Sequence, residues 1–464
     1  MSGETKSKKK YEIDMCNGAI LPKLLAFTLP LMCSSVLQLL FNAADIIVVG
    51  NFAGDTALAA VGSNTALINL LTNFFLGLSI GANVLVARFY GAKAEEDVSD
   101  TVHTAMLLSV FSGIILTVIG CIGARQILIW MQTPEDVLPI ATTYLRIYFI
   151  GMTSMMVYNF GSAILRAVGD TKRPLYYLSA AGVINIGLNL LFVIVFRMSV
   201  AGVALATVIS ETISASLVIR CMMKEKGSIR LTPSKLRIHP KRFAEILRIG
   251  LPASLQGVIF AISNVIIQSS VNSFGSTVVA GNSAASNIEG FVYVSMNSFY
   301  QGTISFTSQN VGAGKYERVN KILFTAQACV IVTGLVLGNL AVFFGPDLLG
   351  FYTRSAAVKA AGMNRLKIIC TVYALCGIMD VMVGSLRGLG YSVMPTIVSL
   401  IGACGLRLLW IFTFFRINEQ FHTPQSLYLT YPVSWIITIC AHVVCFVIVR
   451  RRISRRLKTQ SMAQ

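Results

Sequence analysis

Apolar residues in this chain come in long runs that are separated by short polar connections. A helix that crosses a membrane needs about 20 largely apolar residues. By this length criterion the pattern predicts twelve membrane-spanning helices, each bounded to within several residues. The predicted spans lie near Leu24–Gly50, Leu58–Ala82, Val102–Cys121, Ile140–Ala163, Leu175–Phe196, Val200–Met222, Ile249–Val271, Val279–Ile304, Ile322–Phe344, Leu366–Leu386, Thr396–Phe415 and Leu427–Val449.

The two halves of the chain repeat each other. Phe27-Thr28-Leu29-Pro30 matches Ile249-Gly250-Leu251-Pro252 at an offset of 222, and Leu165-Arg166-Ala167-Val168-Gly169 matches Leu386-Arg387-Gly388-Leu389-Gly390. Each half holds six spans, an even number, so both halves enter the membrane from the same side. Such parallel repeats are related by an axis along the membrane normal, an architecture that suits transport by alternating access.

The predicted fold is therefore an all-α integral membrane protein with twelve transmembrane helices in two six-helix lobes related by a parallel internal repeat. The N-terminal lobe is expected at residues 1–223 and the C-terminal lobe at residues 246–464. A basic connector at residues 224–245 joins them, and it is expected to face the cytoplasm.

Composition narrows the class of protein further. Of the 464 residues, 55% are hydrophobic and 12% are charged, against about 25% charged in soluble proteins. A chain with so few charged residues is neither a soluble globular protein nor a disordered one. The net charge of +18 does not indicate nucleic-acid binding, because the basic residues cluster in the polar segments rather than along a groove with stacking aromatic residues.

The basic residues also predict the topology. If both termini lie in the cytoplasm, 29 of the 38 Lys and Arg residues fall in cytoplasmic segments, including Lys6, Lys8, Lys9 and Lys10. Eight, Arg365 among them, fall in outer loops or the adjoining helix ends, and Arg407 lies inside the eleventh span. This asymmetry follows the positive-inside rule. We expect a multi-pass protein of the cell inner membrane with both termini in the cytoplasm.

No motif predicts a cofactor or a metal cluster. The ten cysteines include no C-x-x-C pair, and they are expected to pack as small apolar side chains. Gly312-Ala313-Gly314-Lys315 lacks the four-residue spacer of a phosphate loop, and Tyr316 replaces its Ser or Thr. ATP binding is therefore not predicted, and energy is expected to come from an ion gradient.

Four acidic residues fall inside the predicted spans, namely Asp45, Glu211, Glu289 and Asp380. An ionisable group at membrane depth costs about 3 kcal/mol or more, so it is expected to face the interior and to serve function. The competing interpretation is structural, a carboxyl group that ties helices together. Asp45 is the first candidate, and Asp380 and Glu289 are candidates for a second ion or substrate site. Glu211 is expected about one turn from the cytoplasmic end of its helix, where it would reach water.

Several motifs are distributed along the chain, namely Leu29-Pro30, Phe41-Asn42-Ala43-Ala44-Asp45, Leu165-Arg166-Ala167-Val168-Gly169-Asp170-Thr171, Gly202-Val203-Ala204 and Gln309-Asn310-Val311-Gly312-Ala313-Gly314. Through these motifs the sequence resembles the MATE (multidrug and toxic compound extrusion) family of cation-coupled exporters from about Ile20 to about Arg450. The resemblance implies export of amphipathic, often cationic compounds in exchange for H⁺ or Na⁺.

The resemblance also implies a coupling site in the N-terminal lobe. The family's coupling carboxylate maps to Asp45, and other members of its polar cluster map to Asn185, Asn189 and Thr207. The sequence departs from the pattern at Asn189, where many relatives carry Asp, and at Phe41, where Tyr is common. Asp45 would then act without a second carboxylate. It could take up a proton, or it could share Na⁺ with the neighbouring oxygens, because hard cations prefer oxygen ligands; the residues leave both options open.

Two alternative functions, a flippase and an enzyme, would each require features that the sequence does not show. A flippase for a lipid-linked oligosaccharide of the same wider superfamily would be expected to carry a more basic cavity. An enzyme would need a catalytic constellation at one membrane depth, and no convincing one is present. The expected partners are a small-molecule substrate and the lipid bilayer, without nucleic acid or ATP, for a protein that works as a monomer.

Overall fold

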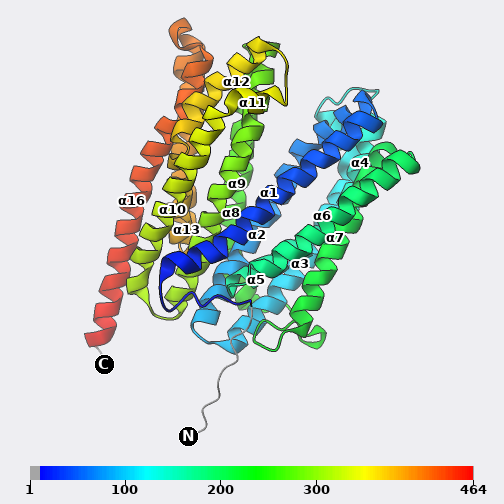
Figure 1. Ribbon diagram of the computed structural model, residues 1–464. Coiled ribbons are helices and arrows are strands. Elements are labelled where there is room, and N and C mark those ends of the chain that lie inside the picture. The colour runs from blue at the N-terminus through cyan, green and yellow to red at the C-terminus, as the bar shows by residue number, and fades with distance from the viewer. Residues whose placement is uncertain (1–10, 463–464) are drawn as a thin grey trace. The chain divides into compact units, whose positions relative to one another are not determined.

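The computed structural model describes residues 11–462, apart from the side chains at positions 55, 58, 62, 63, 65, 66 and 460–462. All regular elements of this part are helical (Figure 1). The basic cluster Lys6–Lys10 lies outside the described residues. The α-helices are α1 (Ile20–Phe52), α2 (Asp55–Gly91), α3 (Glu95–Trp130), α4 (Leu138–Ile150), α5 (Met152–Ala167), α6 (Lys172–Leu190), α7 (Ser199–Lys224), α8 (Pro240–Asn272), α9 (Ser276–Gly312), α10 (Tyr316–Phe343), α11 (Gly345–Gly350), α12 (Ala356–Ile369), α13 (Ala374–Gly388), α14 (Val393–Ser399), α15 (Leu406–Trp410) and α16 (Pro424–Met462).

These helices account for the twelve predicted spans. Within the described residues, nine single helices and two bent helix pairs are long and apolar enough to cross a membrane. The remaining predicted span is α9, which has 37 residues but no stretch apolar enough to be counted with the others. Its buried side chains include Asn282, Glu289, Gln309 and Asn310. Helix α9 is polar because it faces protein interior along much of its length.

Both bent pairs are the fourth span of their half. In the first half α4 and α5 meet at Gly151 with a bend of 44°, and in the second half the segment Ala356–Val372 meets α13 with a bend of 47°. A Cβ atom on Gly151 would lie 2.9 Å from the Val208 side chain. Glycine therefore lets the bend approach α7 closely. Breaks at corresponding places in two repeats are the strongest backbone signal of a transport site.

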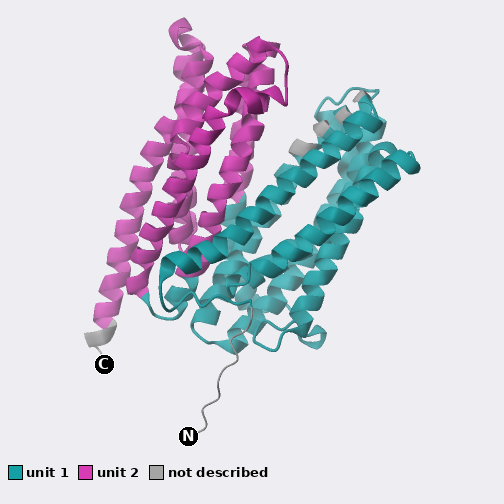
Figure 2. Cartoon of the chain, in the orientation of Figure 1, with its two compact units in different colours: residues 1–254, 308–315 teal, residues 255–307, 316–464 magenta. Residues whose placement is uncertain are grey.

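The chain forms two compact units (Figure 2). Unit 1 comprises Met1–Ser254 and Ser308–Lys315, and unit 2 comprises Leu255–Thr307 and Tyr316–Gln464. The division falls inside two continuous helices, α8 and α9, so each contributes one end to unit 1. The boundaries predicted from the repeat, with a connector at 224–245, remain a prediction.

Close backbone packing explains why the ends of α8 and α9 belong to unit 1. A Cβ atom on Gly81 of α2 would lie 2.3 Å from the Ile246 carbonyl oxygen of α8. A Cβ atom on Gly312 of α9 would lie 1.8 Å from the Arg88 carbonyl oxygen of α2. No larger residue fits at these distances without moving backbone, so glycine permits the contacts.

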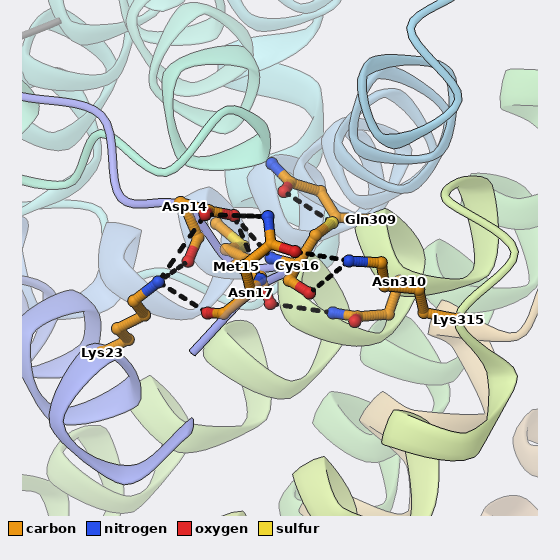
Figure 3. A network of polar contacts seen from close by, with 8 residues as sticks. All are labelled: Asp14, Met15, Cys16, Asn17, Lys23, Gln309, Asn310 and Lys315. Carbon is orange, nitrogen blue, oxygen red and sulfur yellow. Dashed lines mark hydrogen bonds and ion pairs between the residues drawn. The ribbon is translucent and has the colours of Figure 1, made fainter. Parts of the chain in front are cut away.

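The segment that precedes α1 is tied to the end of α9 by hydrogen bonds (Figure 3). The Asn310 side-chain amide donates to the Met15 carbonyl oxygen at 3.0 Å, and the Lys315 ammonium donates to the Cys16 carbonyl oxygen at 3.1 Å. Gln309 donates to the Ala167 carbonyl oxygen at 2.7 Å. The motif Gln309-Asn310-Val311-Gly312-Ala313-Gly314 and Lys315 thus serve packing within unit 1.

Candidate functional site

The four predicted coupling residues come from three helices of unit 1. Asp45 lies on α1, Asn185 and Asn189 lie on α6, and Thr207 lies on α7. The spacing of four places Asn185 and Asn189 on the same face of α6. Asn185 and Asn189 are buried, and Asp45 is half-buried.

Hydrogen bonds connect these side chains in series. The Asn189 amide nitrogen donates to the Asp45 carboxylate, and it also donates to Asn185 Oδ1 at 3.1 Å. The Asn185 nitrogen lies 3.5 Å from Thr207 Oγ1 and 3.4 Å from Ser210 Oγ. The structure therefore brings all four predicted residues together and adds Ser210. The signal that could have found Ser210 is its position one turn after Thr207 on α7.

One acceptor in this cluster is unused. Asn189 is 1% exposed, and its Oδ1 atom has no hydrogen-bond partner among the described residues. A buried acceptor without a donor costs about 1–3 kcal/mol. The cluster thus combines one carboxylate, two amide oxygens and two hydroxyls around an unfilled acceptor. This donor set suits a hard cation such as Na⁺.

Glu289, a candidate for a second site, forms a buried ion pair in unit 2. Its two carboxylate oxygens accept from Arg365 at 2.8 and 2.7 Å, and Arg365 also donates to Asn282 Oδ1 at 2.8 Å. Arg365 is 6% exposed. Arg365 is thus buried next to an acid on α9, and its placement in an outer loop or the adjoining helix end remains a prediction. The apolar pattern does not predict this pair, because its two members lie on different helices, α12 and α9.

Asp380, the other candidate for a second site, lies half-buried on α13. Arg387 of α13 and Tyr293 of α9 both interact with its carboxyl group. Arg387 lies in the last turn of the same helix, and it is bonded to the Tyr300 hydroxyl, to Gln256 Oε1 at 2.8 Å and to Thr396 Oγ1 at 3.3 Å. Its guanidinium joins helices within unit 2.

Arg407 lies inside the eleventh predicted span, between two π-helical segments at Leu400–Gly405 and Ile411–Phe415. It is 5% exposed. Its Nε donates to Ser434 Oγ at 2.8 Å, and its guanidinium lies 4.1 Å from the centre of the Tyr431 ring. Among the described residues no carboxylate pairs with it. Its charge is stabilised by an aromatic face and a hydroxyl.

The position of Glu211 on its helix differs from the expected one. Helix α7 runs from Ser199 to Lys224, so Glu211 stands at its middle and not one turn from its cytoplasmic end. At 1.5 Å per residue, about 20 Å of helix separates it from Lys224. Glu211 instead reaches a small pocket of unit 1, whose lining residues are Tyr148, Gly151, Met152, Met155, Thr207, Val208 and Glu211.

The repeat, the broken fourth spans and the polar cluster agree with a comparison against protein families. The family model described as MatE matches residues 30–191 and again residues 252–413. The chain belongs to the MatE family. The two matched segments begin 222 residues apart, which is the offset found between the Leu-Pro motifs of the two halves. The internal duplication and the resemblance to MATE transporters are thereby confirmed.

Relatives of known name support the same assignment. The chain is 29% identical over 390 residues to "Probable multidrug resistance protein YoeA" of Bacillus subtilis, covering 82% of this chain and 84% of that protein. It is also 29% identical over 396 residues to "Probable multidrug resistance protein YpnP" of the same organism, covering 85% and 88%. Members of the family are multi-pass membrane transporters, so this chain is a transporter and not an enzyme.

Solved structures share the fold. The structure titled "Outward-facing conformation of a multidrug resistance MATE family transporter of the MOP superfamily" matches with a TM-score of 0.87. The alignment covers 97% of this chain and 100% of that chain at 22% sequence identity. The predicted fold class, with twelve helices in two repeated halves, is confirmed.

Proposed function

We propose that this transporter exports amphipathic, cationic small molecules in exchange for H⁺ or Na⁺ by alternating access. The observation that carries the proposal is the hydrogen-bonded chain from Asp45 through Asn189 and Asn185 to Thr207, with the unused Oδ1 of Asn189 within it. A carboxylate beside an unused acceptor at membrane depth offers a place for a small cation to enter and leave.

Asp45 is the coupling group in this proposal. It supplies the only carboxylate of the cluster, because position 189 holds an amide that neither gains nor loses a proton at physiological pH. With a proton as coupling ion, Asp45 alone carries it. With Na⁺, the Asp45 carboxylate would be joined by oxygens of Asn185, Asn189 and Thr207. The described side chains offer oxygen ligands for either ion.

Unit 2 offers a second, weaker candidate for ion or substrate binding at Asp380 and Glu289. Both oxygens of Glu289 already accept from Arg365. Among the described residues Asp380 is not locked in an ion pair of this kind, and Arg387 and Tyr293 interact with its carboxyl group. Asp380 is therefore the better placed of the two acids to bind an added cation.

The charge pattern supports a topology with both termini and the connector 224–245 in the cytoplasm. The proposal further holds that the protein works as a monomer in the inner membrane, without ATP or a cofactor. A cysteine introduced at Ser234 should then react with an impermeant thiol reagent only after cells are permeabilised. The comparison requires a background in which the native cysteines do not react. Labelling on sealed cells would overturn the topology and the direction of transport.

The direct test of the function is transport by the purified protein in proteoliposomes. A fluorescent organic cation is loaded, and a pH gradient or a Na⁺ gradient is imposed alone. Efflux driven by one of the two gradients is expected, and it identifies the coupling ion. If neither gradient drives efflux while the protein remains folded and inserted, secondary antiport of this substrate class is wrong.

A second candidate function is a flippase for a lipid-linked oligosaccharide, which the buried arginines of unit 2 favour. Arg365 and Arg387, however, are already engaged by protein groups. Only Arg407 lacks an acid or an amide partner among the described residues. A single arginine of this kind supplies too little positive charge to bind a diphosphate group. Loss of surface polysaccharide on deletion of the gene, without any change in resistance to organic cations, would favour this alternative.

A further inference from the structure

Helix α16 of unit 2 continues past the membrane-crossing run that is predicted at Leu427–Val449. Figure 1 shows it as a single continuous helix, and it ends at Met462. It contains no Asp or Glu, so no acid of its own can pair with its basic residues. Six basic residues follow the apolar run, namely Arg450, Arg451, Arg452, Arg455, Arg456 and Lys458. The end of α16 is therefore a regular helix with charge of one sign.

Arg450 fixes how this end of the helix is rotated. Its Nε donates to Asn320 Oδ1 at 3.0 Å, and its Nη2 donates to the Tyr316 carbonyl oxygen at 3.0 Å, both in the first turns of α10. Ile453 and Leu457 follow Arg450 by three and seven residues, so they lie on the same face of α16. The face that Arg450 turns toward α10 thus holds one arginine and two apolar side chains.

The opposite face of this helix end carries the other basic residues, and all of them are exposed. They are Arg451, Arg452, Arg455, Arg456 and Lys458. Among the described residues none of these side chains forms a hydrogen bond or an ion pair; the Thr459 hydroxyl bonds only to the backbone of Arg455. The four arginines form two pairs at a spacing of four residues, where like charges repel each other on a helix. Negative charge beside this face would offset the repulsion.

The residue type on this exposed basic face favours phosphate as the negative group. Arginines elsewhere are used differently, since Arg242 is paired with Asp97 and Glu245, and Arg173 likewise has two acidic partners. The positive-inside rule treats Lys and Arg alike, but four of the five residues on the face are Arg. Arginine binds phosphate through two parallel N–H donors, whereas lysine acts as a single point charge.

The depth of the exposed basic face favours a lipid rather than a soluble partner. The face begins two residues after Val449, where the apolar run ends. Its four arginines extend over about 7.5 Å of helix, because each residue adds about 1.5 Å. The headgroup layer on each side of the hydrocarbon core is about 5–8 Å thick. The arginines therefore lie at the level of the lipid phosphates, and a soluble partner would need charges that reach further into water.

We propose that the exposed basic face of α16 binds the phosphate groups of anionic phospholipids in the leaflet at this end of the helix. Clusters of basic residues beside a membrane-spanning helix attract anionic lipids. Bound lipid holds α16 at one depth and rotation. Because Ser434 of the same helix accepts a hydrogen bond from Arg407, the lipid contact also bears on the polar interior of unit 2. This binding is independent of the coupling ion and of the exported compound.

The test measures lipid binding by the purified full-length protein in a neutral detergent. Phosphatidylglycerol and phosphatidylcholine, each labelled on an acyl chain, are titrated with fluorescence anisotropy as the readout. The wild type should bind phosphatidylglycerol about fivefold or more tightly than phosphatidylcholine, and added salt should reduce this preference. Arg451→Gln, Arg452→Gln, Arg455→Gln and Arg456→Gln together should abolish the preference. The same four positions changed to Lys should retain part of it, because the charge remains.

The matched control removes four exposed basic residues from the predicted connector, by Lys224→Gln, Lys226→Gln, Arg230→Gln and Lys235→Gln together. It should keep the preference for phosphatidylglycerol. The melting temperature of each variant is measured alongside and should change little, because the replaced side chains are exposed.

Four results would each overturn the inference. The wild type could bind the two lipids equally, or the folded Gln variant of α16 could keep the preference. An equal loss in the connector variant would mean that net charge, and not this face, attracts the lipid. Displacement of phosphatidylglycerol by an equal concentration of glycerol phosphate or of an acidic peptide would assign the face to a soluble ligand.

Discussion

Two acids inside the predicted spans of unit 1 and one acid of unit 2 have different surroundings. In unit 1 the acids Asp45 and Glu211 have no basic partner among the described residues. In unit 2 Glu289 is locked to Arg365, and Arg387 is held by three neutral side chains. At the repeat offset of 222 the counterpart of Asp45 is Ile267, a buried apolar residue. Duplication preserved the helices but not the chemistry between them.

This difference separates groups that can exchange ligands from groups that hold helices together. A carboxylate without a cationic partner can accept a proton, a metal ion or an organic cation and release it again. A carboxylate bonded by both oxygens to an arginine must first give up that pair, which costs several kcal/mol. We therefore expect substitution of Asp45 to affect transport and substitution of the paired Glu289 to affect stability.

The largest effect is expected from Asp45→Asn. The amide keeps the size of the side chain and part of its hydrogen bonding, but it cannot take up a proton or neutralise Na⁺. No second carboxylate in the cluster can replace it, since position 189 is Asn. Gradient-driven efflux from proteoliposomes should fall to background, while the melting temperature changes little. The matched control is Asp380→Asn; efflux that survives in Asp45→Asn but vanishes in Asp380→Asn would place coupling in unit 2.

A smaller effect, on stability, is expected from Glu289→Gln. It leaves Arg365 buried without a negative partner, and breaking a buried ion pair in this way costs about 3–5 kcal/mol. Thermal unfolding in detergent should shift strongly downward. Glu211→Gln is the matched control from unit 1, where no partner is lost, so its unfolding temperature should stay equal or rise. Equal melting temperatures for the two variants would contradict the distinction between the units.

Much of the fold could be predicted from the sequence, because span-forming runs and the repeat are local or periodic signals. Hydropathy alone does not identify helix α9 as a span, because its many Ser, Asn and Gln residues face protein. Asn185, Asn189 and Thr207 came from the resemblance, and only the structure shows the hydrogen bonds that join them. Arg365 and Glu289 are 76 residues apart, and nothing along the chain signals their pairing.

The position of Glu211 and the role of the segment before α1 cannot be predicted from the sequence for a different reason. The apolar pattern predicts Glu211 near a helix end, although its helix extends thirteen residues beyond it. The hydrogen bond from Asn310 to the Met15 carbonyl oxygen joins residues 295 positions apart. Such contacts depend on how helices pack, and no local pattern encodes them.

The smallest effect is expected where the helix ends of the two halves differ. In the sequence repeat Asn310 of α9 corresponds to Phe89 of α2. Asn310 is fully buried and donates to the Met15 carbonyl oxygen, whereas Phe89 lies 4.5 Å from the Arg242 guanidinium. Asn310→Ala should cost about 1–3 kcal/mol, because it leaves a carbonyl oxygen without that donor.

The matched control is Lys315→Met, in the connection that follows α9. Lys315 donates to the Cys16 carbonyl oxygen and to Asn17 Oδ1, both in more exposed places than the Asn310 bond, and exposed charged contacts contribute about 0–1 kcal/mol. Thermal unfolding of both variants in detergent ranks the two contributions. A larger loss in Lys315→Met than in Asn310→Ala would mean that charge, rather than the buried amide, fixes the segment before α1 to α9.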